Sequence, residues 1–560
     1  MEPAASNATS DAGNQHVWLY AACAALGTVL LCGGPLFICQ PLWADATHYD
    51  VLAQEVLRGR TLYLDVTDTN FPGAVWIHAL VRGTAGWSSE VLRVFDLLVV
   101  AGIAGVLTHV ATRGRERTAA LRIFVIAAVL LYYFACTPMV HCQRDVWMLL
   151  PAALAVWLRF RRISKTEGAS PAVFGGALLE GVLWGAAVWI KPYVIVPALG
   201  CWLAGLIFGI RNGSLGRWNG LIDALGLVAG GLIAGAGGCA WLMAVGSWPH
   251  FWDMMLNWSG EYRSRGDAWS LRIATNLSWY FYFAPWSLLH LITLPLAGIW
   301  CFQGLAASQD GATRKPAAAK VLLAALYLCW FVQGSLIQLS HEYVLSVSML
   351  IALPMLLCWD RVAMPATAMR IGLAVFAAAA LVAHPFAKQE ALATWPLCFS
   401  RGSSPLVKHQ LSTGANRHVM GEAHWQDLAK VEEYLRSRDV SDGELACWDD
   451  SSHVLYTKLK VSPSNRFIHT AVWLSFFQSR QDEIIEEIQQ GNPRFVITDV
   501  QMAGYSAFVA RDEYQRDEPV FPKGMPEIDT FPWNEPIVFR AGRYLVHEVS
   551  DNSAGEPTDP

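Results

Sequence analysis

Long apolar runs alternate with short polar connections over the first two thirds of the chain. The run from Val17 to Cys39 is long enough to cross a bilayer, and further runs of similar character follow it. The pattern predicts eleven membrane-spanning helices, at 17–39, 92–112, 119–135, 146–161, 172–189, 193–210, 220–245, 281–304, 319–338, 343–358 and 369–386. Several runs fall below the ~20 residues of a typical span, so we expect one or two to tilt, end in a cavity or re-enter the membrane.

Arginine and lysine residues mark alternate connections between these runs. They occur at Arg113, Arg115 and Arg117, at Arg159, Arg161, Arg162 and Lys165, at Arg211 and Arg217, at Arg314, Lys315 and Lys320, and at Arg361 and Arg370. The positive-inside rule assigns this side to the cytoplasm. The N-terminus is then predicted inside, and the connections at 43–91, 136–145, Lys191, 246–280 and 339–342 face outside together with the C-terminal tail.

The composition changes at about residue 387, where charged residues become frequent and apolar runs of strand length appear. Helical periodicity covers 425–438 and 482–489, and strands are predicted at 444–448, 494–498 and 537–549. We expect residues 387–560 to form a soluble α/β domain outside the membrane, acting as a lid or recognition module. Residues 1–16 are small and polar and are predicted to be disordered, and 17–386 form the membrane domain.

The composition agrees with a polytopic membrane protein. Of 560 residues, 54% are hydrophobic and only 16% are charged, and the mean hydropathy is +0.32. A net charge of −5 provides no basic surface for nucleic acid. The 25 tryptophans fit aromatic belts at the two membrane interfaces, although sugar sites also use tryptophan.

The 12 cysteines are mostly scattered singly through apolar runs, without zinc-type spacing. Cys136 with Cys142, or Cys398 with Cys447, could form a disulfide if these segments face an oxidising compartment. The sequence requires no cofactor, and it leaves a divalent metal open.

Ionisable residues concentrate in the connection that follows the first span, between Trp43 and Trp76. Asp45, His48, Tyr49 and Asp50 lie just past the end of an apolar run, at one membrane edge. An ionisable group in such a position is a functional candidate by default.

This connection resembles the first external loop of C-type glycosyltransferases, membrane enzymes that take sugars from polyprenyl-phosphate carriers. The resemblance rests on Asp45-x-x-x-Tyr49, Ala53, Leu57-Arg58-Gly59, Tyr63 and the aspartate-rich turn into Pro72-Gly73. The class includes the protein O-mannosyltransferases and the aminoarabinose transferases. Motifs follow in the same order from Trp43 to Leu357, and the tail resembles the external domains of bacterial members. The resemblance implies a multi-pass protein of the plasma (inner) membrane whose C-terminal domain is periplasmic.

The resemblance also implies roles for individual residues. Asp45 matches the presumed general base, and Lys191 in Trp-Ile-Lys-Pro-Tyr matches the Lys-Pro of the family and would bind the donor phosphate. Lysine snorkelling to the headgroups is the alternative for Lys191, although Pro192 breaks the helix where a cavity would begin. Asp145 is an equally balanced choice between a catalytic group and a helix cap, whereas capping is favoured for Asp50, Asp65 and Asp68.

Further candidates come from the other external connections. Donor phosphate binding is assigned to Lys191, His48, Arg144 and Arg263, and substrate binding to Tyr49, Arg93, His341, Glu342 and Tyr343. His341-Glu342-Tyr343 resembles the polar entry to a late span, with a helix cap as the alternative. The chain departs from the family at His48, where the aminoarabinose transferases have arginine. It also departs at Ala46 and Phe71-Pro72, where an acid and Lys-Pro are usual.

The leading hypothesis is an integral-membrane glycosyltransferase that moves a hexose or pentose from a polyprenyl-phosphate donor to a lipid, glycan or protein acceptor. A transporter or flippase is the runner-up, but its polar residues should lie near the bilayer midplane, often in related halves. Here they crowd one interface and no internal repeat is found. A catalytically silent scaffold is the third hypothesis, supported by the absence of an acid beside Asp45.

Overall fold

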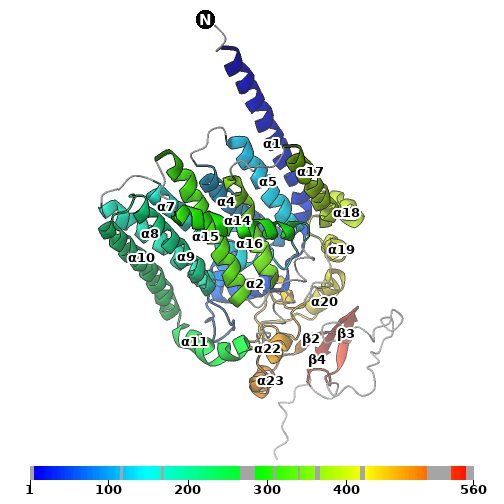
Figure 1. Ribbon diagram of the computed structural model, residues 1–560. Coiled ribbons are helices and arrows are strands. Elements are labelled where there is room, and N and C mark those ends of the chain that lie inside the picture. Colours follow the sequence, from blue (N-terminus) through cyan, green and yellow to red (C-terminus); the bar gives the residue numbers. More distant parts are fainter. Residues whose placement is uncertain are drawn as a thin grey trace, which may run out of the picture.

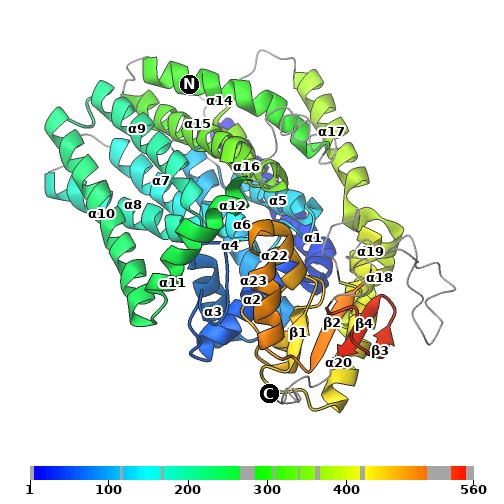
Figure 2. The same cartoon turned by 90° about the horizontal axis from the view of Figure 1, so that it is seen from below.

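The computed structural model describes residues 5–113, 118–164, 170–264, 284–306, 311–337, 341–359, 366–415, 423–500 and 531–549. A bundle of long helices fills most of the molecule, and a small mixed domain lies at one end of it (Figures 1 and 2). The N-terminus lies at the opposite end of the molecule from this domain in Figure 1.

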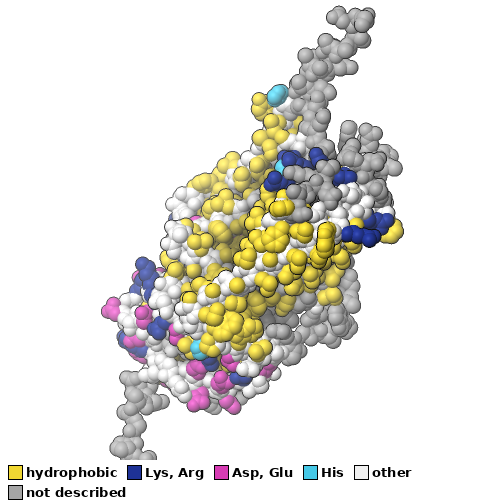
Figure 3. Space-filling view, turned by 90° about the vertical axis from the view of Figure 1, so that its left-hand side faces the viewer, with side chains coloured by type: hydrophobic (Ala, Val, Ile, Leu, Met, Phe, Trp, Pro, Cys, Tyr) yellow, Lys and Arg dark blue, Asp and Glu magenta, His cyan; other side chains and the backbone are white. Residues whose placement is uncertain are grey.

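Each of the eleven predicted spans overlaps a helix, and residues 281–283 of the span predicted at 281–304 lie outside the described residues. These helices are α1 (Ala5–Cys39), α4 (Ser89–Ala111), α5 (Ala119–Ala135), α7 (Leu149–Ile163), α8 (Ser170–Ile190), α9 (Ile195–Arg211), α10 (Arg217–Ala244), α14 (His290–Ala306), α15 (Gly311–Ile337), α16 (His341–Met355) and α17 (Ala366–Ala383). Among the described residues, seven helices are long and apolar enough to cross a membrane, and α5, α16 and α17 contain shorter apolar segments. Figure 3 shows the resulting band of hydrophobic side chains, with charged side chains on either side of it.

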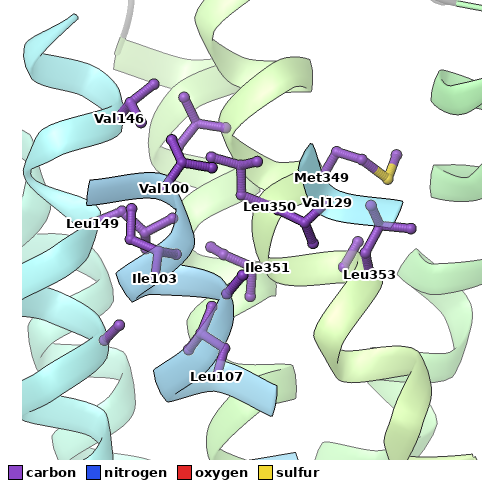
Figure 4. Close-up of a cluster of buried hydrophobic side chains, with 14 of the residues drawn as sticks. Val100, Ile103, Leu107, Val129, Val146, Leu149, Met349, Leu350, Ile351 and Leu353 are labelled. Atoms are coloured by element: carbon purple, nitrogen blue, oxygen red, sulfur yellow. The ribbon is translucent and has the colours of Figure 1, made fainter. Parts of the chain in front are cut away.

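The core of the bundle is formed where α4, α5, α7 and α16 face one another. Val100, Ile103 and Leu350 are 0–1% exposed and point into this cluster (Figure 4). Lipid tails are as apolar as these side chains, so close packing rather than removal from water stabilises the contact. Small residues allow similarly close packing between α8 and α10, where the two backbones are in contact at Gly181 and Gly230.

A buried ion-pair cluster joins α7, α8 and α10 away from the C-terminal domain. Arg159 Nη1 lies 2.6 Å from Asp223 Oδ2, and Arg159 Nε lies 3.0 Å from Glu180 Oε2. Arg162 pairs with both acids. Arg159 is therefore not the loop charge that the basic pattern predicts. Its side chain is fully buried because two carboxylates from neighbouring helices compensate its charge.

Several segments predicted to be irregular are helical. The connection after the first span contains α2 (Ala44–Leu57) and α3 (Gly73–Ala85), and another contains α6 (Arg144–Trp147). A third contains α11 (Trp248–Asp253), η2 (Met254–Trp258) and α12 (Ser259–Ser264). Helix α1 begins at Ala5, so the predicted disordered tail is largely helical, because extending an existing helix is easier than starting one.

The C-terminal domain has the predicted α/β character. Helices α18 (Gln389–Arg401) and α19 (Pro405–Ala415) lead into α20 (Trp425–Ser437), which with α23 (Gln481–Gln490) confirms the two predicted helices. Helices α21 (Val454–Leu459) and α22 (Thr470–Phe476) lie between them. Strands β1 (Leu445–Cys447), β2 (Phe495–Asp499), β3 (Ile537–Ala541) and β4 (Tyr544–Glu548) form one sheet of order β1-β2-β4-β3.

The single strand predicted at 537–549 is a hairpin. Strands β3 and β4 are antiparallel, and Gly542 between them has φ +54°, a conformation that favours glycine. The strand-like pattern of apolar and polar residues continues through the turn, and for this reason the sequence predicts one strand. Neither proposed disulfide is present, because all 12 cysteines are free thiols.

Candidate functional site

Helix α2 carries the cluster of ionisable residues and is buried along most of its length. Its first turn contains Asp45, and Val51, Leu52 and Ala53 are fully buried on its inner side. An acidic residue in the first turn is favourable, because the N-terminal end of a helix carries partial positive charge. Asp45 does not itself cap the helix, because the N-cap residue of α2 is Trp43.

The C-terminal domain holds α2 from one side. His453 Nε2 lies 2.7 Å from Thr47 Oγ1 and 2.9 Å from the Ala44 carbonyl. At the other end of the helix, Ser462 Oγ donates to Glu55 Oε2 at 2.7 Å. Since these contacts lie at both ends of α2, the domain is fastened directly over the candidate site.

Helix α3 holds α2 from a second side. Asp50 Oδ2 lies 2.5 Å from Arg82 Nη2, and Asp50 Oδ1 lies 2.8 Å from His78 Nδ1. All three side chains are buried, and the cation with its hydrogen bonds lowers the pKa of Asp50 against the effect of burial. Asp50 is thus the centre of an ion-pair network that positions α2, rather than the cap that sequence reasoning favours.

Lys191 and Asp145 form a close ion pair at the same membrane edge. The Lys191 ammonium lies 2.7 Å and 2.9 Å from the two oxygens of Asp145, and the residues are only 8% and 1% exposed. Lys191 follows the last residue of α8, whereas Asp145 belongs to α6. Both were sequence candidates, and the structure brings them together. Asp145 faces a cation and is not the N-cap of α6, which is Gln143, and the Lys191 ammonium contacts protein instead of headgroups.

The position of Lys191 depends on a close approach between α3 and α8. A Cβ atom added at Gly73 would lie 2.5 Å from the Trp189 carbonyl oxygen, so only glycine fits there. The rings of Phe71 and Trp76 pack against Trp189 at 5.7 Å and 5.4 Å between centroids. The Phe71-Pro72-Gly73 turn therefore fixes the end of α8 immediately before Lys191.

Arg144 links this ion pair to α2. Its guanidinium donates to the Tyr49 hydroxyl and lies 5.6 Å from the centre of the Tyr49 ring. Burial by itself would lower the pKa of Arg144, but the facing groups Tyr49, Asp68, Asp145 and Asp45 raise it above its ordinary value. The charge of Asp45 also acts on Lys191. Arg144, Asp145 and Lys191 thus converge between α6 and the end of α8, and the Asp45 carboxylate of α2 lies within electrostatic reach of both cations.

Three histidines form a second cluster beside Asp68. His48 of α2 lies 4.6 Å from His469 and 6.2 Å from His453 between ring centroids, and its Nε2 lies 4.0 Å from Asp68 Oδ1. Burial and the neighbouring imidazoles lower the pKa of His48 well below 6.5. His48 is therefore neutral at pH 7, which makes it a hydrogen-bonding group and not the cation that the missing arginine would supply. Sequence reasoning missed both partner histidines because they lie more than 400 residues away.

Because these imidazoles are buried in the neutral form, we expect the folded protein to lose stability as the pH falls. Burial lowers the pKa of His453 to about 4, whereas the unfolded chain titrates near 6.5, so between these values protons bind only the unfolded state. Through His453, the free energy of unfolding should then fall by about 2 kcal/mol between pH 7 and pH 5. We expect thermal unfolding of the reconstituted protein to show this loss and His453→Gln to reduce it. The same pH response in His453→Gln and wild type would contradict the prediction; His250→Gln on α11 is the control.

Five sequence candidates remain, of which the structure describes the side chain of one. Arg93 of α4 is fully buried, donates to the Pro41 carbonyl and stacks 4.9 Å from the Phe37 ring, so it holds the end of α1. Arg263 lies in α12, and His341, Glu342 and Tyr343 begin α16, but their side chains lie outside the described part of the structure. The roles predicted for Arg263, His341, Glu342 and Tyr343 stay predictions.

No group of three or more histidine, cysteine or acidic side chains suited to a metal ion occurs among the described residues.

No family model matches the chain, and no curated protein matches it in sequence. Its fold is similar to that of ArnT from Cupriavidus metallidurans bound to undecaprenyl phosphate, with a TM-score of 0.58 and 13% identity over 96% of this chain and 99% of that chain. The apo state of ArnT has a TM-score of 0.57 and 14% identity, over 96% of this chain and 98% of that chain. AglB from Archaeoglobus fulgidus, in complex with an inhibitory peptide and a dolichol-phosphate, has a TM-score of 0.43 and 13% identity. This match covers 86% of this chain and 70% of AglB. The ArnT likeness includes nearly the whole of both chains, and it confirms the predicted C-type glycosyltransferase fold.

Proposed function

We propose that this chain is a membrane glycosyltransferase that moves a hexose or pentose from a polyprenyl-phosphate donor to an acceptor on the outer side of the membrane. The observation that carries the proposal is the convergence of Asp45, Arg144, Asp145 and Lys191 at one membrane edge, in a chain with the ArnT fold. The undecaprenyl phosphate bound by ArnT supports the choice of donor. A transport path would instead require polar groups near the bilayer midplane.

The donor phosphate is assigned to Lys191 and Arg144. Both cations lie where an anionic headgroup can reach them while its polyprenyl chain remains among apolar helices. In the structure Asp145 neutralises Lys191, and the Tyr49 hydroxyl accepts from Arg144. An incoming phosphate therefore exchanges with these partners, and Asp145 acts by holding the ammonium in place before the donor arrives. His48 brings no positive charge to the phosphate, because burial lowers the pKa of its ring.

Asp45 is assigned as the general base. In a single displacement, an acceptor hydroxyl oxygen forms a bond to the anomeric carbon while the bond from that carbon to the phosphate oxygen breaks. The bonding pair leaves with the phosphate, whose developing charge Lys191 and Arg144 stabilise, and the hydroxyl proton goes to the Asp45 carboxylate. Attack opposite the leaving group inverts the anomeric centre.

The direct test is transfer by the purified full chain in vesicles that contain a labelled polyprenyl-phosphate sugar. We expect label to leave the lipid carrier and unlabelled polyprenyl phosphate to accumulate. A chain that binds the donor and moves it across the bilayer without cleaving it would instead be a flippase, and this result would overturn the proposal.

We further propose that the N-terminus is cytoplasmic and that the C-terminal domain lies outside. Support comes from the basic connections, and from α2, whose contacts with the C-terminal domain require both to share one face. A C-terminal tag should be labelled by a membrane-impermeant reagent in intact cells, whereas an N-terminal tag should be labelled only after lysis. The reverse result would place the site inside and overturn the orientation while leaving the fold intact.

A further inference from the structure

An apolar groove runs along α1 on the side of the bundle that carries α18. It lies between α1, α5, the end of α17 and α18, and its volume is about 430 Å³. One water needs only about 10–15 Å³, so the groove can hold a much larger group. Figures 1 and 2 both place α17 and α18 on the opposite side of the bundle from α8 and α10, so the groove lies away from Lys191 at the end of α8.

The position of α1 sets the membrane depth of the groove. The lining on α1 extends from Thr28 to Gly33, and the helix ends at Cys39. A rise of 1.5 Å per residue puts this lining about 9–16 Å below the end of the helix, within the roughly 30 Å of hydrocarbon in a bilayer. Trp395 Nε1 of α18 donates to the Leu31 carbonyl at 3.1 Å. Helix α18 therefore reaches the same depth, although the sequence assigns it to the soluble domain.

The lining is mostly apolar, and its polar side chains already have partners within the protein. Thr28 Oγ1 donates to the Ala24 carbonyl at 2.9 Å, and His384 Nε2 lies 3.1 Å from the Leu131 carbonyl. His384 Nδ1 accepts from the Phe386 amide at 3.1 Å. The apolar part of the lining includes Val29, Phe134, Leu381 and Leu392. A hydrocarbon chain therefore fits this groove better than a sugar or a phosphate, which would find no unmatched donor or acceptor in these side chains.

Helix α18 forms one wall of the groove and has a second apolar face that points away from the protein. Its inner side packs on α1, where the Cys39 thiol donates to the Cys398 carbonyl at 3.8 Å. Leu392 and Phe399, in contrast, are 58% and 62% exposed. A helix that exposes large apolar side chains beside a membrane span is stabilised by contact with lipid, because water would leave this surface unfavourably hydrated.

We propose that this groove binds one acyl chain of a membrane phospholipid, and that α18 lies in the membrane half next to the C-terminal domain as a wall of the site. Acyl chains surround the protein at this depth, and an empty groove would leave its lining without contacts. A chain in the groove touches several helices at once, so it is held more firmly than lipid on the outer face of a single helix. The inference is independent of the proposed function, because it uses only the membrane position of α1.

The test identifies the residues that a photoreactive lipid labels. The full chain is reconstituted in phosphatidylcholine vesicles that contain phosphatidylcholine with a diazirine in one acyl chain. One sample is irradiated in the vesicles and a second after exchange into lipid-free detergent, and mass spectrometry locates the label. In vesicles we expect label on Leu392 and Phe399 and none on the exposed Lys430 of α20. After detergent exchange, label should remain on the groove residues and disappear from Leu232 on the outer face of α10.

Matched variants separate the groove from general effects. Ala387→Phe places a ring in the groove lining and should lower the retained label about tenfold, which corresponds to about 1.4 kcal/mol of binding free energy. Ala236→Phe adds the same ring to an exposed position of α10 outside the groove and should leave the retained label unchanged.

Three results would overturn the proposal. The first is wild-type protein without groove label after detergent exchange. The second is displacement of this label by added polyprenyl phosphate, which would assign the groove to the donor chain, or cross-linking of the groove to a second copy of the chain. The third is the absence of label from Leu392 and Phe399 in vesicles, which would place α18 in water. None of these measurements needs sugar transfer, so they remain decisive even if the proposed function fails.

Discussion

Replacement of Asp45 by asparagine is expected to reduce sugar transfer by about 100-fold to 10,000-fold, the usual effect of losing a general base. Asparagine keeps the size of the side chain and can remain in the first turn of α2, so folding should be preserved. Donor binding should also persist, because Lys191 and Arg144 are intact. The measurements are the initial rate of transfer at saturating donor and the dissociation constant of the donor.

Asp65→Asn is the matched control for this experiment. Asp65 belongs to the same external segment but is exposed, and it only accepts a hydrogen bond of 2.7 Å from the Thr61 backbone in a turn. Its transfer rate should stay close to that of wild type. A well-folded Asp45→Asn protein with full activity would leave Asp45 only a favourable charge in the first turn of α2 and would require another base.

Replacement of Lys191 by methionine is expected to have two separable effects. Loss of a charge-assisted bond to the donor phosphate should weaken donor binding by about tenfold to more than a hundredfold. The substitution also leaves the Asp145 carboxylate, which is 1% exposed, without its cation, which costs about 3–5 kcal/mol of stability for a buried pair. Donor titration and thermal unfolding measure the two effects independently.

The double variant Asp145→Asn with Lys191→Met distinguishes these effects. Removing both charges should restore most of the thermal stability, because no unpaired carboxylate remains buried. Donor affinity should stay low, because the cation is still missing. Restored donor affinity in the double variant would mean that Lys191 only neutralises Asp145, and the phosphate partner would then be sought at Arg144 and Arg263.

Much of the candidate site was accessible from local sequence patterns. Asp45, Arg144, Asp145 and Lys191 each stand at the end of an apolar run, where an ionisable group is conspicuous. Their mutual geometry was not accessible, because Asp145 and Lys191 are separated by one complete helical hairpin. The sequence suggested that Lys191 meets the donor phosphate or the headgroups, and the pair with Asp145 changes what a lysine substitution measures.

The sequence by itself determined the membrane helices and the class of the C-terminal domain. A bilayer requires about 20 apolar residues for each span, and helix and strand periodicities are local properties that a single segment carries. The tertiary structure alone decided which polar groups meet. Thr47 contacts His453 at a sequence separation of 406, and Trp425 and Asp450 share a cleft with the first turn of α2. Such contacts depend on how whole domains pack. A hydrogen bond between side chains that are distant in sequence produces no local periodicity from which it could be predicted.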